Sequence, residues 1–254
     1  MDRPPEAAFT AVGPPTAPAI VFLHGTRLSR TSWAAQLHDL GGEFRVIAVD
    51  LPGHGSRAAE TFTLEGATDA VASVIRDEAA EGHAVVVGLS LGGYVAMALA
   101  ARHPDRVRGL VLAGATAEPV GLRSIPYRAL AVILDRFDGP RLVRLNTWFF
   151  RTRYPASIAE PIVAGGFWSK GGARAVRALF GQRFMPRLAA YPGPTLIVNG
   201  DWDLLFRLSA GSFAAAARDA RRVRLAGALH LSNLDRPAAF SHAVRRFARS
   251  LRGT

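Results

Sequence analysis

The chain has 254 residues, of which 49% are hydrophobic and 20% charged, and it contains no cysteine. This composition excludes a wholly disordered chain, a collagen-like repeat and a small disulfide scaffold, and it leaves one globular domain with a sizeable core. Without cysteine, thiolate catalysis, cysteine-ligated zinc and iron–sulfur clusters are excluded as well.

The formal net charge of +11 raises the question of nucleic-acid binding. All but one of the 31 basic residues are arginine, the exception being Lys170, and they form no long run beside stacking aromatic residues. Such a bias indicates codon usage rather than a surface built for phosphates. We therefore expect no nucleic-acid partner.

Two segments bear on localisation. Residues 1–18 are rich in proline and carry Asp2 and Glu6, so they lack the basic flank and apolar stretch of a signal peptide. Residues 84–101 are apolar and long enough to cross a bilayer, but Ser90 and several glycines in their middle favour a strand that turns into a helix. We expect a cytoplasmic protein with no membrane partner.

Short apolar segments alternate with helical patterns along most of the chain. The expected strands are residues 19–23, 46–49, 84–88, 107–113, 195–199 and 223–225. The expected helices are residues 32–40, 64–81, 91–102, 208–220 and 237–251. Thr63 is the expected N-cap of the second helix, and Pro237 suits the first turn of the last one. This alternation predicts an α/β fold with a mostly parallel, doubly wound sheet.

The alternation stops over residues 118–190, where arginine, proline and aromatic residues gather. Ten of the chain's 22 aromatic residues lie there, which predicts an inserted helical cap over an apolar cavity. The expected organisation is a first core part, 1–117, the cap, 118–190, and a second core part, 191–254.

The pattern Gly-x-Ser-x-Gly occurs at residues 88–92. A valine-rich segment runs directly into it and an alanine-rich helical segment runs directly out, as in a nucleophile elbow. In that turn the serine is strained, and the glycines on both sides avoid collisions with neighbouring backbone. The helix that follows directs its positive N-terminal dipole and the Leu91 amide toward an oxyanion. Ser90 is therefore the candidate nucleophile.

A serine hydroxyl needs a base and an orienting carboxylate, and both have candidates downstream. His230 follows the last expected strand, and Asp201 and Asp203 both follow the strand before it. Glu118 follows an earlier strand and is a further candidate acid. The chain order of serine, acid and histidine is the one found in hydrolases with this kind of elbow.

Four segments in this order resemble the α/β-hydrolase fold superfamily from about Ala19 to the C-terminus. They are His24-Gly25-Thr26, the segment Asp50-Leu51-Pro52-Gly53-His54-Gly55-Ser56, the elbow, and the segment from His230 to Pro237. The resemblance implies that Ser90 is the nucleophile, His230 the general base and then acid, and Asp203, three residues after Gly200, the orienting acid. It also implies that the backbone amides of Thr26 and Leu91 form the oxyanion hole, with no cofactor and no metal.

The resemblance extends to the reaction. Because dehalogenases and epoxide hydrolases of this family carry aspartate at the elbow, Ser90 argues against both. The elbow and the segment Ala228-Leu229-His230 look similar to those of enol-lactone hydrolases and small-ester carboxylesterases. We expect a small, partly apolar ester or lactone as substrate. The alternatives are a cofactor-independent oxygenase or perhydrolase, a carbon–carbon hydrolase, and a non-catalytic receptor for small molecules.

Two further features remain open. The cap holds eleven arginines and Lys170 against four acidic residues, a net charge of +8, so one hypothesis is that a cap arginine binds a substrate carboxylate. Leu229 stands where the family often has glycine, and the short N-terminal segment indicates a shortened opening hairpin. An edge left open in this way could recruit a second chain, so we expect a monomer or a homodimer.

Overall fold

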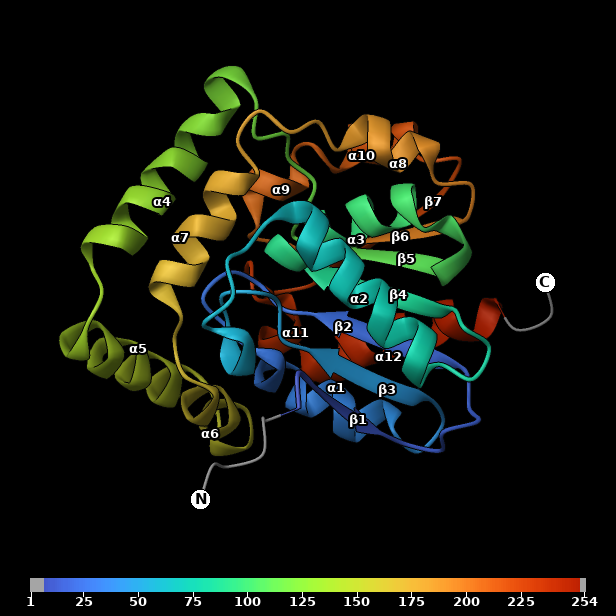
Figure 1. Cartoon of the computed structure of the whole chain (residues 1–254), viewed down its shortest axis with the longest axis horizontal. Helices are drawn as coiled ribbons and strands as arrows, with labels where there is room; N and C mark the ends of the chain where they lie inside the picture. The colour runs from blue at the N-terminus through green and yellow to red at the C-terminus, as the bar shows by residue number, and fades with distance from the viewer. Residues whose placement is uncertain (1–6, 252–254) are drawn as a thin grey trace.

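Seven strands form one mostly parallel sheet in residues 7–251, the part of the chain that the computed structural model describes (Figure 1). The strands are β1 (Phe9–Val12), β2 (Ala19–Leu23), β3 (Arg45–Val49), β4 (Ala84–Leu89), β5 (Val107–Ala113), β6 (Pro194–Gly200) and β7 (Asp219–Leu225). Their order across the sheet is β1-β3-β2-β4-β5-β6-β7, with β1 antiparallel to β3 and the other pairs parallel.

The register of the central strands brings their carboxyl ends to one place. Leu23 at the end of β2 pairs with Gly88 of β4, and Leu89 pairs with Ala113 at the end of β5. These strands are buried along almost their whole length, as expected for valine-rich strands covered on both faces. The residues that follow β2, β4 and β5 are therefore neighbours at the same edge of the sheet.

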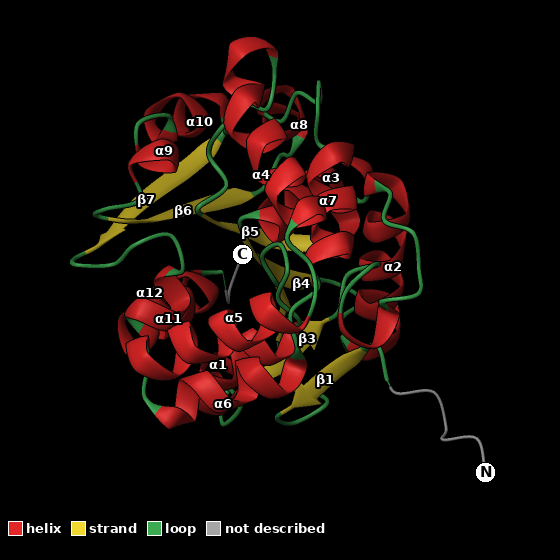
Figure 2. Cartoon of the chain, turned by 90° about the vertical axis from the view of Figure 1, so that its left-hand side faces the viewer, coloured by secondary structure: helices red, strands yellow, loops and turns green. Residues whose placement is uncertain are grey.

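Helices cover both faces of the sheet (Figure 2). The helices of the main layers are α1 (Ala34–Leu40), α2 (Leu64–Glu78), α3 (Leu91–Arg102), α9 (Leu204–Arg207), α10 (Ala210–Ala216), α11 (Ser232–Asp235) and α12 (Pro237–Ser250). Apolar side chains of α2 and α3 share one core with one face of the sheet, and those of α1 and α12 share a second core with the other. The doubly wound α/β-hydrolase architecture expected from the sequence is thereby confirmed.

Helices α4 (Ile125–Arg136), α5 (Pro140–Arg153), α6 (Ala156–Gly165), α7 (Ser169–Ala178) and α8 (Met185–Ala190) lie between β5 and β6. Figure 1 shows α4, α5, α6 and α7 at one side of the molecule, beyond the carboxyl edge of the sheet. Helix α4 packs against α7 and α5 against α6, whereas α8 packs against α3 and α10. The bounds of the cap at 118 and 190 stay a prediction.

The observed elements follow the expected ones closely, with two differences. The N-terminal segment forms β1, which pairs with residues 46–49 of β3 and is itself the edge strand of the sheet. The expectation of a shortened opening hairpin with an open edge stays a prediction. The expected helix at 208–220 is shorter, because the chain is already extended as β7 from Asp219. The alanines at 214–217 favour a helix and therefore gave no sign that α10 ends at Ala216. Strand β7 is a partly exposed edge strand, so its first residues do not form the apolar run by which a buried strand is predicted.

Thr63 and Pro237 take the places that their residue types predict. The Thr63 hydroxyl accepts a hydrogen bond from the Gly66 amide at 3.0 Å, which caps α2, and Pro237 begins α12. In the described part of the chain, no helix combines the length and the apolar character that crossing a bilayer requires.

The segment after β3 is fixed by the buried carboxylate of Asp50. This carboxylate accepts hydrogen bonds from the backbone amides of Arg30 and Ser56, at 2.7 and 2.9 Å, and pairs with the Arg30 guanidinium. Gly55 has a positive φ of 55°, and a Cβ there would lie 2.1 Å from an Asp50 oxygen. Asp50 thus holds the two loops that follow β2 and β3 together.

Two buried histidines complete this packing, with ring centroids 5.0 Å apart. His24 accepts the Leu51 amide at Nε2 (3.0 Å) and donates from Nδ1 to the Gly25 carbonyl (2.9 Å), so it is neutral. His54 donates from Nδ1 to the Pro52 carbonyl at 3.0 Å. Burial lowers the pKa of both imidazoles, and that of His54 to about 3.

We expect His54 to make the fold sensitive to acid. As the pH falls from 6.5 toward 3, the unfolded chain protonates this imidazole and the folded chain does not, so the free energy of unfolding decreases with falling pH. The slope from one such group is at most about 1.4 kcal/mol per pH unit. Urea unfolding of wild type and His54→Asn across this range checks it. Parallel pH profiles for the two proteins would contradict the assignment.

Candidate active site

Ser90 occupies the turn between β4 and α3 in a strained conformation, with φ 51° and ψ −114°. For a residue with a side chain this conformation costs about 1–3 kcal/mol, and the surrounding backbone must hold it. The Ser90 amide donates to the Ala113 carbonyl at 2.8 Å. A Cβ at Gly88 would lie 2.3 Å from the Gly92 carbonyl oxygen, and one at Gly92 would lie 2.1 Å from that of Leu23. The glycines of the motif therefore allow the contacts that force the turn.

The loop after β2 lies directly against this turn. The Gly92 amide donates to the His24 carbonyl at 3.1 Å, and Gly25 packs beside the Ser90 side chain. Thr26 follows, and its hydroxyl donates to the Gly172 carbonyl at the start of α7 (3.4 Å). Among the described residues, neither the Thr26 nor the Leu91 backbone amide donates a hydrogen bond to another protein group. Both amides are free to bind an acceptor.

Asp203 and His230 come from the loops after β6 and β7 and form a hydrogen bond. His230 Nδ1 donates to Asp203 Oδ2 at 3.0 Å, and the aspartate side chain is only 6% exposed. The Phe206 ring stacks on the imidazole with 4.9 Å between centroids and 19° between planes. The bond fixes the ring orientation and leaves Nε2 as the nitrogen available to a reacting group.

The two other candidate acids lie elsewhere. Asp201 pairs with Arg224 at 2.7 Å and accepts the Gly227 amide, on the outer side of the loop after β6. Glu118 is buried and accepts the amides of Phe184 and Met185 at 2.9 and 2.6 Å, so it caps the start of α8. The geometry brings Asp203 to the histidine and neither of the alternatives.

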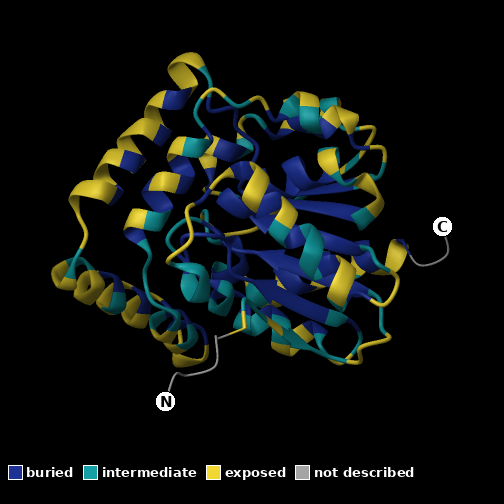
Figure 3. Ribbon diagram, viewed as in Figure 1, coloured by how far each residue is buried: buried dark blue, intermediate teal, exposed yellow. Residues whose placement is uncertain are grey.

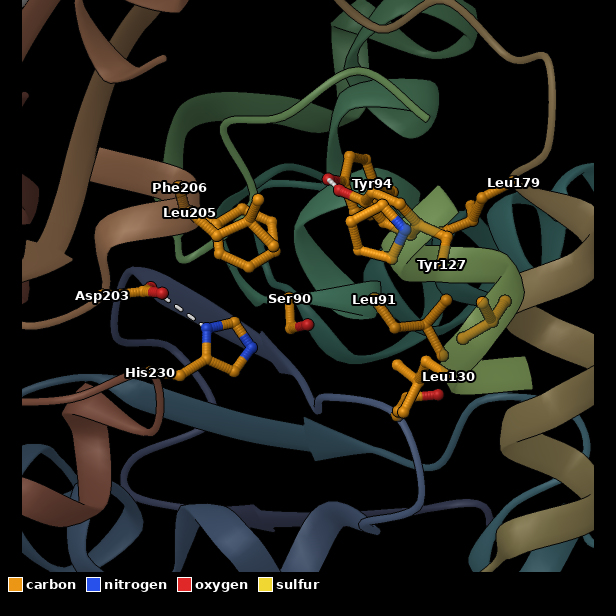
Figure 4. A pocket seen from close by; sticks show the side chains of 13 residues that line it. Ser90, Leu91, Tyr94, Tyr127, Leu130, Leu179, Asp203, Leu205, Phe206 and His230 are labelled. Atoms are coloured by element: carbon orange, nitrogen blue, oxygen red, sulfur yellow. Dashed lines mark hydrogen bonds and ion pairs between the residues drawn. The ribbon is translucent and has the colours of Figure 1, made fainter. Parts of the chain in front are cut away.

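A cavity of about 290 Å³ lies where these loops meet α4, α7 and α9 (Figure 4). Ser90 and His230 both line it, and no hydrogen bond joins them among the described residues; such bonds often form only when a substrate is bound. The remaining lining is Thr26, Leu91, Tyr94, Pro126, Tyr127, Leu130, Val176, Leu179, Asp203, Leu205 and Phe206. No arginine is among these lining residues.

Two tyrosines supply the polar part of one wall. The Tyr94 hydroxyl donates to the Ala117 carbonyl at 2.8 Å, so the 2.5 Å contact between the two hydroxyls requires Tyr127 to donate to Tyr94. Burial raises the pKa of Tyr127 to about 12, and the phenol stays protonated. Its remaining lone pair is available as an acceptor.

Sequence reasoning missed Gly114, Phe206 and Tyr94, and it expected Tyr127 only as one of the aromatic residues of the cap. Gly114 follows β5 with φ 54°, and a Cβ there would lie 2.9 Å from the His230 ring and 3.0 Å from an Asp203 oxygen. A glycine just after a buried strand is the available signal for such a close approach. Phe206 and Tyr127 carried no comparable signal, because aromatic residues at helical spacing are usual in cores. Among the described residues, no group of three or more histidines and acids is placed to hold a metal ion.

A strained serine between a buried strand and a helix, facing an aspartate–histidine pair at the same sheet edge, is the arrangement of the α/β-hydrolase fold. The comparison with family models agrees: the model described as the alpha/beta hydrolase family matches residues 20–243. The chain belongs to this family.

Individual relatives narrow the resemblance. The pimeloyl-[acyl-carrier protein] methyl ester esterase of Neisseria meningitidis serogroup C is 39% identical over 121 residues, 47% of this chain and 45% of that protein, so the match spans less than half of the relative. The 3-oxoadipate enol-lactonase 1 of Acinetobacter baylyi is 26% identical over 94% of this chain and 91% of its own length. The malate-bound structure of a thermophilic esterase from Thermogutta terrifontis superposes with a TM-score of 0.78 at 26% identity, covering 96% of this chain and 93% of that one.

Gly114→Ala tests how closely the backbone approaches the Asp203–His230 pair. The added methyl group must displace the imidazole, so we expect loss of the downfield proton resonance of His230 Nδ1. Gly121→Ala is the matched control, since Gly121 has φ 52° and open space around its Cβ position. Both variants bear the same backbone strain, roughly 1–3 kcal/mol of unfolding free energy. An unchanged resonance in Gly114→Ala would refute the close approach.

Proposed function

We propose that the protein is a serine hydrolase that cleaves a carboxylic ester or lactone of a small, partly apolar substrate through an acyl-enzyme on Ser90. The observation that carries the proposal is the convergence of four loops on one apolar cavity, which brings together the strained serine, the two free amides beside it and the hydrogen-bonded aspartate–histidine pair. These are the nucleophile, the oxyanion donors and the base that acyl transfer requires.

The mechanism follows from these positions. The Ser90 oxygen attacks the ester carbonyl while His230 Nε2 takes the hydroxyl proton, and Asp203 stabilises the imidazolium through Nδ1. The amides of Leu91 and Thr26 stabilise the oxyanion, helped by the N-terminal dipole of α3. His230 then returns the proton to the leaving alcohol or enol. Water deprotonated by the same imidazole hydrolyses the acyl-enzyme and releases the carboxylic acid.

The cavity indicates the kind of acyl group. Its volume of about 290 Å³ is at the small end for ligand pockets, and its walls are mostly leucine, valine and aromatic carbon. The free lone pair of Tyr127 can accept a hydrogen bond from one substrate donor. The names of the relatives, a methyl ester esterase and an enol-lactonase, favour ester or lactone cleavage over the oxygenase, perhydrolase and carbon–carbon hydrolase alternatives.

Hydrolysis of p-nitrophenyl esters of increasing acyl length tests the reaction. We expect wild type to prefer short acyl chains, because the cavity is small, and Ser90→Ala to lose about a thousandfold or more of kcat. Ser73→Ala, on the outer helix α2, is the control and should match wild type. If wild type and Ser90→Ala are equally inert on esters while wild type cleaves β-diketones or uses peroxide, the ester proposal fails.

The pairing of acid and histidine gives a sharper test. Asp203→Asn should lower kcat by roughly a thousandfold to ten-thousandfold, since the neutral amide no longer holds the imidazole tautomer or stabilises its charge. Asp201→Asn, two residues earlier on the same loop, should stay within a few-fold of wild type, because its carboxylate faces Arg224. Steady-state kinetics on one ester suffices. Comparable losses in both variants would remove Asp203 from its proposed role.

A further inference from the structure

The outward faces of α4 and α5 expose an unusual amount of apolar side chain. We name as the cap apolar face Ile125, Val132, Ile133, Phe137, Trp148 and Phe149, each between 42% and 62% exposed. The two helices form one outer side of the molecule in Figure 1, and Figure 3 shows their outward surfaces exposed. Exposed apolar patches of this kind mark binding surfaces in proteins.

The face is built into the helices rather than scattered over them. Ile125, Val132 and Ile133 are seven and eight residues apart, which places them along one side of α4, while Tyr127 and Leu134 on the other side are buried. Helix α4 is therefore apolar on both sides. Only the side with Tyr127 and Leu134 packs on the rest of the protein, so we infer that the outward apolar side of α4 binds a separate partner.

The charges beside the face select the kind of partner. Arg136, Arg141 and Arg144 lie at the junction of α4 and α5 and have no acidic partner among the described residues. A second copy of the chain, packed through this face, would bring these like charges together. An anionic surface would instead neutralise them while covering the apolar side chains.

The cavity also has exposed apolar side chains at its rim. Leu130 of α4 lines the cavity and is 38% exposed, and Leu205 of α9 lines it and is 49% exposed. Figure 4 shows these leucines on opposite sides of the pocket. Beyond Leu205, Leu204 and Leu208 are also exposed. An apolar rim on both sides suits a ligand that leaves an apolar phase, which favours a lipid surface over an acidic protein.

We propose that the cap apolar face docks the protein on an anionic lipid surface, with aromatic and aliphatic side chains at the level of the headgroups and the three arginines on anionic lipids. The sequence led us to expect no membrane partner because it offered no spanning segment, and this docking is peripheral. Passage of an ester with an apolar acyl chain between Leu130 and Leu205 rests on the proposed function. The docking itself does not.

Co-sedimentation with vesicles tests the docking separately from catalysis, using the full chain with Ser90→Ala so that no lipid is cleaved. We expect binding to vesicles of phosphatidylglycerol and phosphatidylcholine in equal parts, and much weaker binding to phosphatidylcholine alone. Arg136→Gln, Arg141→Gln and Arg144→Gln together should weaken binding by about fivefold for each arginine removed. The matched control removes Arg221, Arg222 and Arg246, which lie on β7 and α12 and likewise have no acidic partner in the described part of the chain; it should bind nearly as wild type.

The apolar part is tested by Ile133→Ser, Phe137→Ser and Trp148→Ser in one chain, which should bind at least about tenfold more weakly. The control variant with Ile133→Leu, Phe137→Leu and Trp148→Phe keeps these side chains apolar and should retain binding. Circular dichroism checks that all variants fold. Absence of vesicle binding by the starting protein, or equal losses from both arginine triplets, overturns the proposal. A dimer in sedimentation equilibrium that dissociates in the variant with three serine substitutions also overturns the proposal, because it assigns the face to a second copy of the chain. Preferential binding to an acidic protein overturns it as well, because it assigns the face to a protein partner.

Discussion

The site depends on the backbone conformation at Ser90. A positive φ is unfavourable for serine, and it persists because the turn is clamped from three sides: the Ala113 carbonyl holds its amide, Leu23 packs against Gly92, and Gly88 packs against the first turn of α3. These contacts come from β4 itself and from its two neighbours, β2 and β5. The stability of the buried parallel sheet therefore maintains the strain that keeps the serine side chain in the cavity.

The same edge of the sheet determines where the other groups lie. Parallel strands bring the loops after β2, β4, β5, β6 and β7 together, so groups that are far apart in sequence meet without long connections. Gly114, after β5, contributes by having no side chain, which leaves room for the Asp203–His230 pair. Asp50 does not line the cavity, but its carboxylate accepts the Arg30 amide and so fixes the loop after β2 that carries Thr26.

Much of this could be predicted from sequence because the signals are local and strong. The strands at 19–23 and 107–113 and the helix at 91–102 have the expected bounds, and Ser90, Asp203 and His230 lie one, three and five residues after the ends of β4, β6 and β7. The missed elements lack such signals. Strand β1 is short and half exposed, and its pairing with β3 is a long-range contact. Phe206 and Tyr127 acquire their places only when α9 and α4 meet the sheet edge.

The cap shows most clearly where composition misleads. Its aromatic residues predicted either a roof over the cavity or packing onto the core, and Tyr127 and Phe184 satisfy these expectations, whereas Phe137, Trp148 and Phe149 face outward. Its arginines were a candidate site for a substrate carboxylate, yet none lines the cavity. Charge and exposed apolar surface thus coincide on the outside of the cap, while the cavity is apolar with its polar groups held near Ser90. The proposed substrate chemistry therefore uses the interior of the cap, and the proposed docking on a lipid surface uses the exterior of the same helices.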